Sequence, residues 1–304
     1  MTHFLMVPFT GLGLYRGFRG TRWLKNRIKI FEQFVIPSLL AQTNKNFIVW
    51  IAWRYEEKSN PVVKEFKARL ELCGLKFVHT HSGCPMYDDK YPDEVARIRL
   101  LDALHGSTGE LINIMGESKV ILMTIQPSDD CYHRNMVKGV QAVFEKIRKI
   151  QAFGFRRGYV MDYVSKKLAE WNPNTIPPFF TIKFPREVFI DPLKHAAYTG
   201  PYVSHEYIGT SLKFGSIEHR GFIVGTHGEN ISTIFNHPFR GKSFNDAERD
   251  TILGDFGLSN VVPLRLDASV RKILMRWFPY GWQKKLRYWL GEKIYARFYE
   301  FIRR

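Results

Sequence analysis

Short apolar runs alternate with longer helical segments along the first 150 residues of the chain. The apolar runs have the length of buried strands and cover residues 4–9, 47–53, 75–79 and 119–125. Between them, apolar side chains recur three or four positions apart, as on helices with one buried face, over residues 23–42, 61–72 and 92–105. Strands that alternate with helices at this spacing predict an α/β fold with a mostly parallel sheet flanked by helices.

Two prolines set further expectations for these helices. Asn60 stands directly before Pro61, so we expect Asn60 to cap a helix whose first residue is Pro61. Pro37 lies inside the segment 23–42, where we expect it to kink the helix or to begin a new one, because proline donates no backbone hydrogen bond.

The pattern is less regular in the second half of the chain. It predicts a helix over 134–150, strands over 158–170, 179–184 and 222–226, and a short helix over 204–212.

The last segment differs from the rest in composition. Residues 269–304 carry ten Lys or Arg against two Glu, about half of the net charge of +16, and many aromatic side chains. We therefore divide the chain into a domain at 1–266 and a basic, amphipathic helical tail at 267–304. Such a tail suits the surface of an anionic membrane. The alternative is a pair of helices packed on the domain with a solvated basic face.

Composition narrows the class of protein. A hydrophobic content of 45% suits a folded globular chain, and a net charge of +16 favours an anionic partner such as nucleic acid, anionic lipid or a phosphorylated substrate. The three scattered cysteines indicate reduced thiols and not a disulfide framework. We see neither a signal peptide nor an apolar run of the roughly 20 residues that span a bilayer, so we expect a cytoplasmic protein.

Two adjacent carboxylates, Asp129 and Asp130, follow the apolar run 119–125. Ligands of open α/β sheets bind at the carboxyl ends of strands, and paired carboxylates there require a cation or hydrogen-bond donors. A Mg²⁺ or Mn²⁺ ion that bridges to a diphosphate would meet this need. The alternative is that one aspartate caps the helix that begins near Arg134.

Several other polar residues stand at strand ends or on helices. His227 follows the strand 222–226 and is a candidate ligand for a phosphate or metal, although a histidine in such a place is often only a polar surface residue. Arg16 lies in a glycine-rich loop after the first strand, and Arg97 and Arg99 lie on the helix 92–105. Each arginine is a candidate contact for the nucleotide or phosphates, or a solvated basic side chain.

The segments VIPSLLAQT (35–43), Asn46-Phe47 with the strand after it, and FIVGTHGENIST (222–233) resemble the GT-A glycosyltransferases, and more narrowly a bacterial rhamnosyltransferase family. The resemblance extends over roughly residues 3–240. It implies a GT-A-like (Rossmann-like) fold and an enzyme that takes a nucleotide-diphosphate sugar as donor and a cell-surface glycan or lipid-linked acceptor. It also implies a divalent cation, Mn²⁺ or Mg²⁺, and an inverting transfer. From the resemblance together with the basic tail, we expect the enzyme to lie peripherally on the inner face of the cell membrane.

The resemblance also assigns roles to individual residues. Its D-x-D-D motif falls on residues 127–130, where Pro127 replaces the first aspartate and removes one expected contact to the ribose. Asp129 would be the main ligand of the metal or diphosphate, with Asp130 and His227 assisting. Glu206 matches the place of the catalytic base, with His205 as the competing candidate; both could instead belong to a plain helix start.

Two other classes of function remain at this point. The charge and the aromatic side chains would suit a nucleic-acid-binding protein, but the sequence contains no recognisable nucleic-acid-binding motif. The proline at position 127 would suit a non-catalytic relative that binds nucleotide sugars without turning them over.

Overall fold

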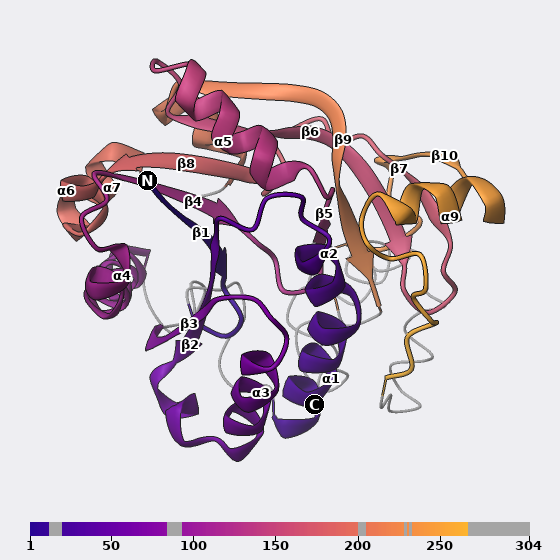
Figure 1. Ribbon diagram of the computed structural model, residues 1–304, viewed down its shortest axis with the longest axis horizontal. Helices are drawn as coiled ribbons and strands as arrows, with labels where there is room; N and C mark the ends of the chain where they lie inside the picture. The colour runs from indigo at the N-terminus through magenta and orange to yellow at the C-terminus, as the bar shows by residue number, and fades with distance from the viewer. Residues whose placement is uncertain (12–19, 84–92, 200–204, 228–229, 231–232, 267–304) are drawn as a thin grey trace, which may run out of the picture.

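The computed structural model describes residues 1–11, 20–83, 93–199, 205–227, 230 and 233–266 (Figure 1). Its first half contains four strands, which are β1 (Thr2–Val7), β2 (Ile48–Arg54), β3 (Phe77–Gly83) and β4 (Val120–Ile125). They pair in parallel in the order β3-β2-β1-β4. This confirms the alternation of strands and helices expected from the apolar pattern. The predicted tail at 267–304 lies outside the described residues.

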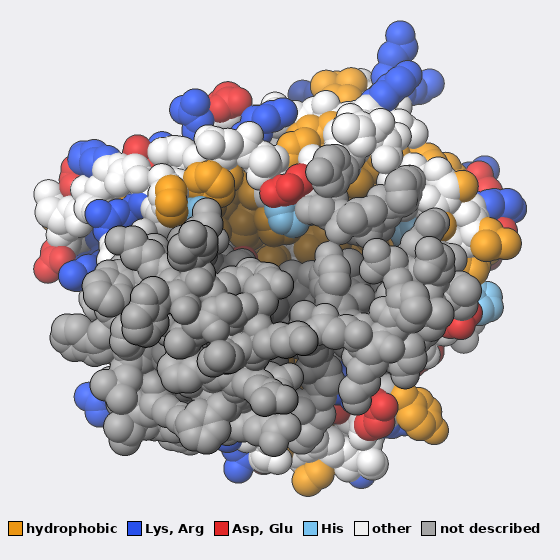
Figure 2. All heavy atoms as spheres, turned by 180° about the vertical axis from the view of Figure 1, so that it is seen from behind, with side chains coloured by type: hydrophobic (Ala, Val, Ile, Leu, Met, Phe, Trp, Pro, Cys, Tyr) orange, Lys and Arg blue, Asp and Glu red, His pale blue; other side chains and the backbone are white. Residues whose placement is uncertain are grey.

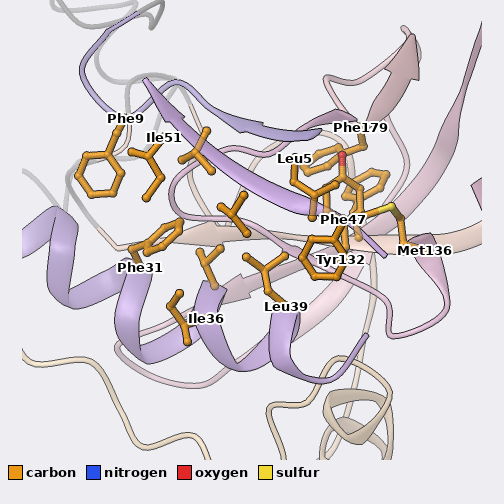
Figure 3. Packing of buried hydrophobic residues seen from close by; sticks show 14 of the residues in the cluster. Leu5, Phe9, Phe31, Ile36, Leu39, Phe47, Ile51, Tyr132, Met136 and Phe179 are labelled. Atoms are coloured by element: carbon orange, nitrogen blue, oxygen red, sulfur yellow. The ribbon is translucent and has the colours of Figure 1, made fainter. Parts of the chain in front are cut away.

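Helices cover both faces of this parallel sheet and bury the apolar side chains of β1, β2 and β4 on both sides. The helices are α1 (Thr21–Ile30), α2 (Ile36–Leu40), α3 (Pro61–Glu71), α4 (Asp93–Met115) and α5 (Met136–Lys146). In β1, Leu5 and Val7 join one hydrophobic cluster with α1, α2, α3 and α5, whereas Phe4 and Met6 join a second cluster with α4. Figure 3 shows the first cluster, in which helix side chains such as Phe31 and Leu39 point toward the strands.

The second half of the sheet is mainly antiparallel. Its strands are β5 (Cys131–Tyr132), β6 (Ala152–Asp162), β7 (Leu168–Trp171), β8 (Phe180–Pro185), β9 (Phe214–Thr226) and β10 (Arg240–Ser243). The main order is β10-β7-β6-β8-β4-β1-β2-β3, and only the pair β6–β9 is parallel in this half. The α/β class is confirmed, but outside the first four strands only β6 and β9 pair in parallel, because the later strands return through hairpins and short helices.

A tight turn splits the strand expected over 158–170 into β6 and β7. The carboxylate of Asp162 accepts hydrogen bonds from the backbone of Val164 and the hydroxyl of Ser165, and Lys166 has a φ of 59°. This local hydrogen bonding ends the extended backbone and reverses the chain. The remaining helices, α6 (Arg186–Phe189), α7 (Pro192–Thr199), α8 (Ile208–Ser211) and α9 (Asp246–Gly254), are short.

The segment expected as one helix over 23–42 is continuous but changes its winding. A π-helical stretch, Phe31–Val35, lies between α1 and α2, and Pro37 follows it in the first turn of α2. Proline cannot donate to the preceding turn, and a wider turn before it accommodates that loss. The other proline expectation is also confirmed, because Asn60 accepts a hydrogen bond from the backbone of Val62 at the start of α3.

Within the described residues, no helix is long and apolar enough to cross a membrane. On the described part of the face in Figure 2, Lys and Arg side chains lie dispersed among acidic, polar and hydrophobic ones.

Candidate functional site

Three predicted site residues come together at the carboxyl end of β4. Asp129 and Asp130 lie in the loop between β4 and β5. The short strand β5 pairs antiparallel with β9, with Cys131 opposite Ile223, so the residue that follows β9 lies beside this loop. That residue is His227, and its Nε2 atom is 3.0 Å from Oδ2 of Asp129.

Asp129 is the centre of the cluster. Its Oδ2 atom lies 2.6 Å from Nη1 of Arg27 and 3.3 Å from Nδ2 of Asn230, in addition to the contact with His227. Asn230 is itself held by His227, whose backbone N–H donates to the Asn230 side chain at 2.8 Å. One cation from α1 and two hydrogen-bonding side chains that follow β9 therefore converge on one carboxylate oxygen. We call Arg27, Asp129, His227 and Asn230 the Asp129 cluster.

The Asp129 cluster is largely shielded from solvent. The exposed fraction is 1% for the Arg27 side chain and 14% for Asp129. Burial alone would raise the pKa of Asp129, but the guanidinium of Arg27 and the hydrogen bond from His227 hold this pKa well below its usual range. Arg27 also lies over the ring of Trp23, 5.5 Å from its centroid, so its guanidinium contacts both an aromatic face and a carboxylate.

Asp130 is in a different environment from its neighbour. Its Oδ1 atom accepts a hydrogen bond of 2.8 Å from the backbone N–H of Gly225. Burial and the charge of Asp129 raise the pKa of Asp130 well above its usual value. Neither aspartate caps the following helix, since Asn135 is the N-cap of α5 and makes no side-chain capping bond.

Aromatic and thiol groups fix the backbone of this loop. The hydroxyl of Tyr163 donates to the carbonyl oxygen of Asp129 at 2.8 Å, and the Tyr163 ring stacks on Phe34 with 3.6 Å between centroids. A Cβ atom at Gly225 would lie 2.3 Å from the same carbonyl oxygen, so only glycine fits there. Burial raises the pKa of the Cys131 thiol to about 12, which keeps it protonated beside Phe34.

The donor set around the acidic pair does not fit a divalent cation. Oδ2 of Asp129 is already surrounded by a guanidinium, an imidazole and an amide, and Asp130 is bonded to a backbone N–H. Across the described part of the chain, no group of three or more His, Cys, Asp or Glu side chains could hold a metal ion. The predicted ligands Asp129, Asp130 and His227 are thus adjacent, but arranged around a protein cation.

A second polar group lies at the carboxyl ends of β1 and β2. The hydroxyl of Thr10 donates to Oε2 of Glu57, and it accepts from the backbone N–H of Arg54 at 3.3 Å. Glu57 is only 3% exposed, and its Oε1 atom has no hydrogen-bond partner among the described residues. Burial raises the pKa of Glu57 above its ordinary value.

Backbone segments approach each other very closely beside this group. A Cβ atom on Gly11 would lie 2.5 Å from the carbonyl oxygen of Trp53, and one on Gly83 would lie 2.3 Å from Cα of Gly11. The ends of β1, β2 and β3 therefore meet at a point where only glycine fits. This edge lies at the carboxyl ends of the parallel strands, where ligands of open α/β sheets bind.

The predicted catalytic residues lie on a separate element, the 3₁₀ turn η3 (His205–Tyr207). Glu206 is exposed, and its Oε1 atom accepts a hydrogen bond of 3.2 Å from Thr175. Nδ1 of His205 donates to the carbonyl oxygen of Ile176 at 2.6 Å. Beside this turn, residues 209–214 with Ile176 and Arg156 line a pocket of about 510 Å³.

The three predicted arginines cannot be placed at the site. Arg16 lies outside the described residues, and Arg97 and Arg99 lie on α4 in a stretch whose side chains are likewise not described.

Two residues of the site, Arg27 and Glu57, were not predicted from the sequence. The signal for Arg27 was present, because a charged residue at that position stands four residues after Trp23 on the apolar face of α1.

A family described as "Putative rhamnosyl transferase" matches residues 18–71. This match bears out the resemblance to rhamnosyltransferases over the segment that contains α1, α2, β2 and α3. No curated protein matches the chain in sequence.

Two solved structures are among those with some similarity to this fold. The crystal structure of TarS from S. aureus is 14% identical, with a TM-score of 0.37, over 95% of this chain and 47% of its own. The apo structure of mouse xyloside xylosyltransferase 1 is also 14% identical, with a TM-score of 0.33, over 69% of this chain and 74% of its own. The chain thus spans about half the length of TarS, and TM-scores below 0.5 do not bear on its activity.

Proposed function

We propose that the chain is a glycosyltransferase that moves a sugar from a nucleotide-diphosphate donor to a cell-surface glycan or a lipid-linked acceptor. The observation that carries this proposal is the match of residues 18–71 to the rhamnosyl transferase family. The matched segment also contains Arg27, which pairs with Asp129 at the carboxyl end of β4 and so belongs to the candidate site. Rhamnose is the first donor sugar to test, since the matching family is described by that sugar.

The donor would bind along the carboxyl ends of the parallel strands, as ligands of open α/β sheets do. The nucleotide would lie near Gly11 and Gly83, at the end of the sheet where the unsatisfied Oε1 atom of Glu57 can take part in a hydrogen bond. The diphosphate would lie toward Asp129 and His227, and Arg16, in the sequence after β1, is a candidate cation for it.

An inverting transfer needs a base that removes the proton of the acceptor hydroxyl. Glu206 is the better candidate, because it is exposed and a carboxylate has further lone pairs beside the one that Thr175 engages. His205 already uses Nδ1 to bond the backbone of Ile176. The pocket beside η3 would receive the acceptor, and the basic tail at 267–304 would hold the protein at an anionic membrane surface.

A thermal-shift screen of nucleotide sugars tests the proposal. We expect one nucleotide sugar to raise the melting temperature of the full chain and to be hydrolysed slowly, and both effects to be lost in Asp129→Ala. If no nucleotide sugar stabilises the chain at millimolar concentration, the proposal is wrong.

Other outcomes of the same screen distinguish the remaining classes. Binding without turnover on any donor would favour a non-catalytic relative, for which Pro127 is the motivating residue. Salt-sensitive binding of DNA at physiological ionic strength would favour a nucleic-acid-binding protein.

A vesicle assay tests the role proposed for the tail. We expect the full chain to sediment with anionic vesicles but not with neutral ones, and a chain without residues 267–304 to lose this binding.

A further inference from the structure

The resemblance to GT-A enzymes implies a divalent cation at the acidic pair, whereas the Asp129 cluster already contains a cation that belongs to the protein. We propose that this site works without a bound divalent metal, with the guanidinium of Arg27 as the permanent counter-charge of Asp129. The part of this inference that concerns the nucleotide-sugar donor rests on the proposed function. The part that concerns metal binding rests only on the arrangement of the described residues.

The first step is the position of Arg27. Its Nη1 atom is 2.6 Å from Oδ2 of Asp129, and its side chain is 1% exposed. A guanidinium stays protonated at all relevant pH values, so the positive charge at this oxygen is fixed. A metal ion that bound the same oxygen would first have to displace a buried guanidinium, and a buried charge without its partner is strongly unfavourable.

The second step concerns the other possible ligands. Nε2 of His227 is engaged by Oδ2 of Asp129, and Oδ1 of Asn230, the atom through which an amide binds a metal, already accepts from the backbone N–H of His227. Asp130 uses Oδ1 to accept from Gly225. A cation on the remaining oxygen of Asp129 would share that carboxylate with Arg27, and two like charges would then lie within a few ångströms of each other in a buried site.

The third step is the residue that is absent from the motif. Pro127 stands where the resemblance places a first aspartate, so the loop has one carboxylate fewer than a D-x-D-D metal site. The loop after β4 therefore has one anion fewer than that motif, and α1 places the cation of Arg27 beside it. Both features act in the same direction, since each lowers the negative charge that a divalent cation would otherwise neutralise.

α1 holds Arg27 rigidly enough for this role. The helix packs its Trp23, Leu24 and Ile28 side chains into the large hydrophobic cluster against β1 and β2. Farther along the same helical segment, the carbonyl oxygen of Phe34 accepts from the thiol of Cys131 in β5, 3.4 Å away, so the segment contacts both the acidic loop and the strand that follows it. The backbone that carries Arg27 could therefore move only if the whole segment shifted.

The test measures Mn²⁺ uptake by the full chain after removal of metals with EDTA. Free Mn²⁺ gives an electron paramagnetic resonance signal that is lost on binding. We expect the unmodified chain and Asp129→Asn to leave the same free signal. We expect Arg27→Met to remove more of it, because Asp129 is then a buried carboxylate without its guanidinium. Lys25→Met is the matched control, an exposed cation on the same helix, and should behave as the unmodified chain does.

Two results would overturn the inference. One is Mn²⁺ uptake by the unmodified chain that Asp129→Asn lacks. The other is an Arg27→Met chain that binds no more Mn²⁺ than the unmodified one. That result would show that Arg27 does not keep a divalent cation away from Asp129.

A second measurement uses only the unmodified chain, so it does not depend on whether a variant folds. The shift in melting temperature caused by a nucleotide sugar should be equal in EDTA and in Mn²⁺, and a shift seen only with Mn²⁺ contradicts the inference. If no nucleotide sugar shifts the melting temperature in either condition, the proposed function fails, while the Mn²⁺ titration still decides the metal question.

Discussion

At the scale of single residues, the most informative side chain is an arginine in a position that the helical pattern assigns to the core. Trp23, Arg27 and Phe31 are each four residues apart and are all buried along α1 and the turn that continues it. A charged side chain is rarely buried so deeply unless it is paired. Arg27 therefore indicates a buried partner. The sequence alone could not show that Asp129, about 100 positions away, is that partner, because strand order decides which loop reaches the helix.

Replacing Arg27 by Met should destabilise the fold. Asp129 would keep its burial and lose its strongest partner, and breaking a buried ion pair on one side costs about 3–5 kcal/mol. The free energy of unfolding from urea titrations measures this. The double variant Arg27→Met with Asp129→Asn should recover a clear part of the loss, because it leaves no unpaired charge. Lys25→Met should change the value by less than about 0.5 kcal/mol. Equal losses in the single and double variants would contradict the pairing.

At the scale of elements, the ends of β1, β2 and β3 are joined by contacts between backbones. Gly83 follows the apolar part of β3 and touches Gly11 after β1, and neither position tolerates a Cβ atom without movement of the opposite chain. Glycines in these loops were visible in the sequence. Their pairing across the edge of the sheet was not, since it depends on the distance between strands that only the folded sheet sets.

Gly83→Ala should push the ends of β1 and β3 apart. Its Cβ atom would lie 2.3 Å from Cα of Gly11, and overpacking of this kind costs about 1–3 kcal/mol. The variant should also lose nucleotide binding if the nucleotide lies over this edge. Unfolding in urea and a nucleotide titration measure the two effects. Gly109→Ala in α4 is the control, because nothing lies within 4 Å of the place that its Cβ atom would take. It should be neutral or stabilise the helix by roughly 1 kcal/mol. An unchanged Gly83→Ala chain would refute the close approach.

The sequence predicted the elements of the first half well because each has a strong local signal. Continuous apolar runs mark strands buried on both faces, and Asn60 with Pro61 marks the start of α3. The second half was predicted less well, since its strands are formed by pairing with distant partners. β8 lies between β4 and β6, and β9 begins eight residues before the apolar stretch at 222–226 that the periodicity showed. The polar first part of β9 is a strand because β6 pairs with it.

At the scale of the whole molecule, several buried histidines make the fold sensitive to acid. Burial lowers the pKa of His3 and of His79 to about 3, and that of His195 to about 4. The neutral ring is also required by hydrogen bonds, because Nδ1 of His3 accepts from Gln141 and Nδ1 of His79 accepts from Trp53. The folded chain therefore holds these rings in the unprotonated form.

The stability of the chain should fall as the pH drops from about 6.5 toward about 3. Over that interval the unfolded chain binds protons that the folded chain excludes, so each such histidine lowers the free energy of unfolding by up to about 1.4 kcal/mol per pH unit. Urea titrations at several pH values give the slope. His3→Gln should make it shallower. An unaltered slope in His3→Gln would show that His3 is not one of the groups responsible.

The span of the Asp129 cluster along the chain has a consequence for the order in which the protein assembles. Its members come from the first, middle and last thirds, and His227 is 98 positions from Asp129. β1, which begins at residue 2, likewise lies between β2 and β4, and β4 begins at residue 120. During synthesis, Arg27 emerges about 100 residues before Asp129, so their buried ion pair forms only after the loop that follows β4 has been made. Contacts between residues so far apart in sequence slow folding. A chain that ends before residue 227 lacks the hydrogen bonds that His227 and Asn230 make to Asp129.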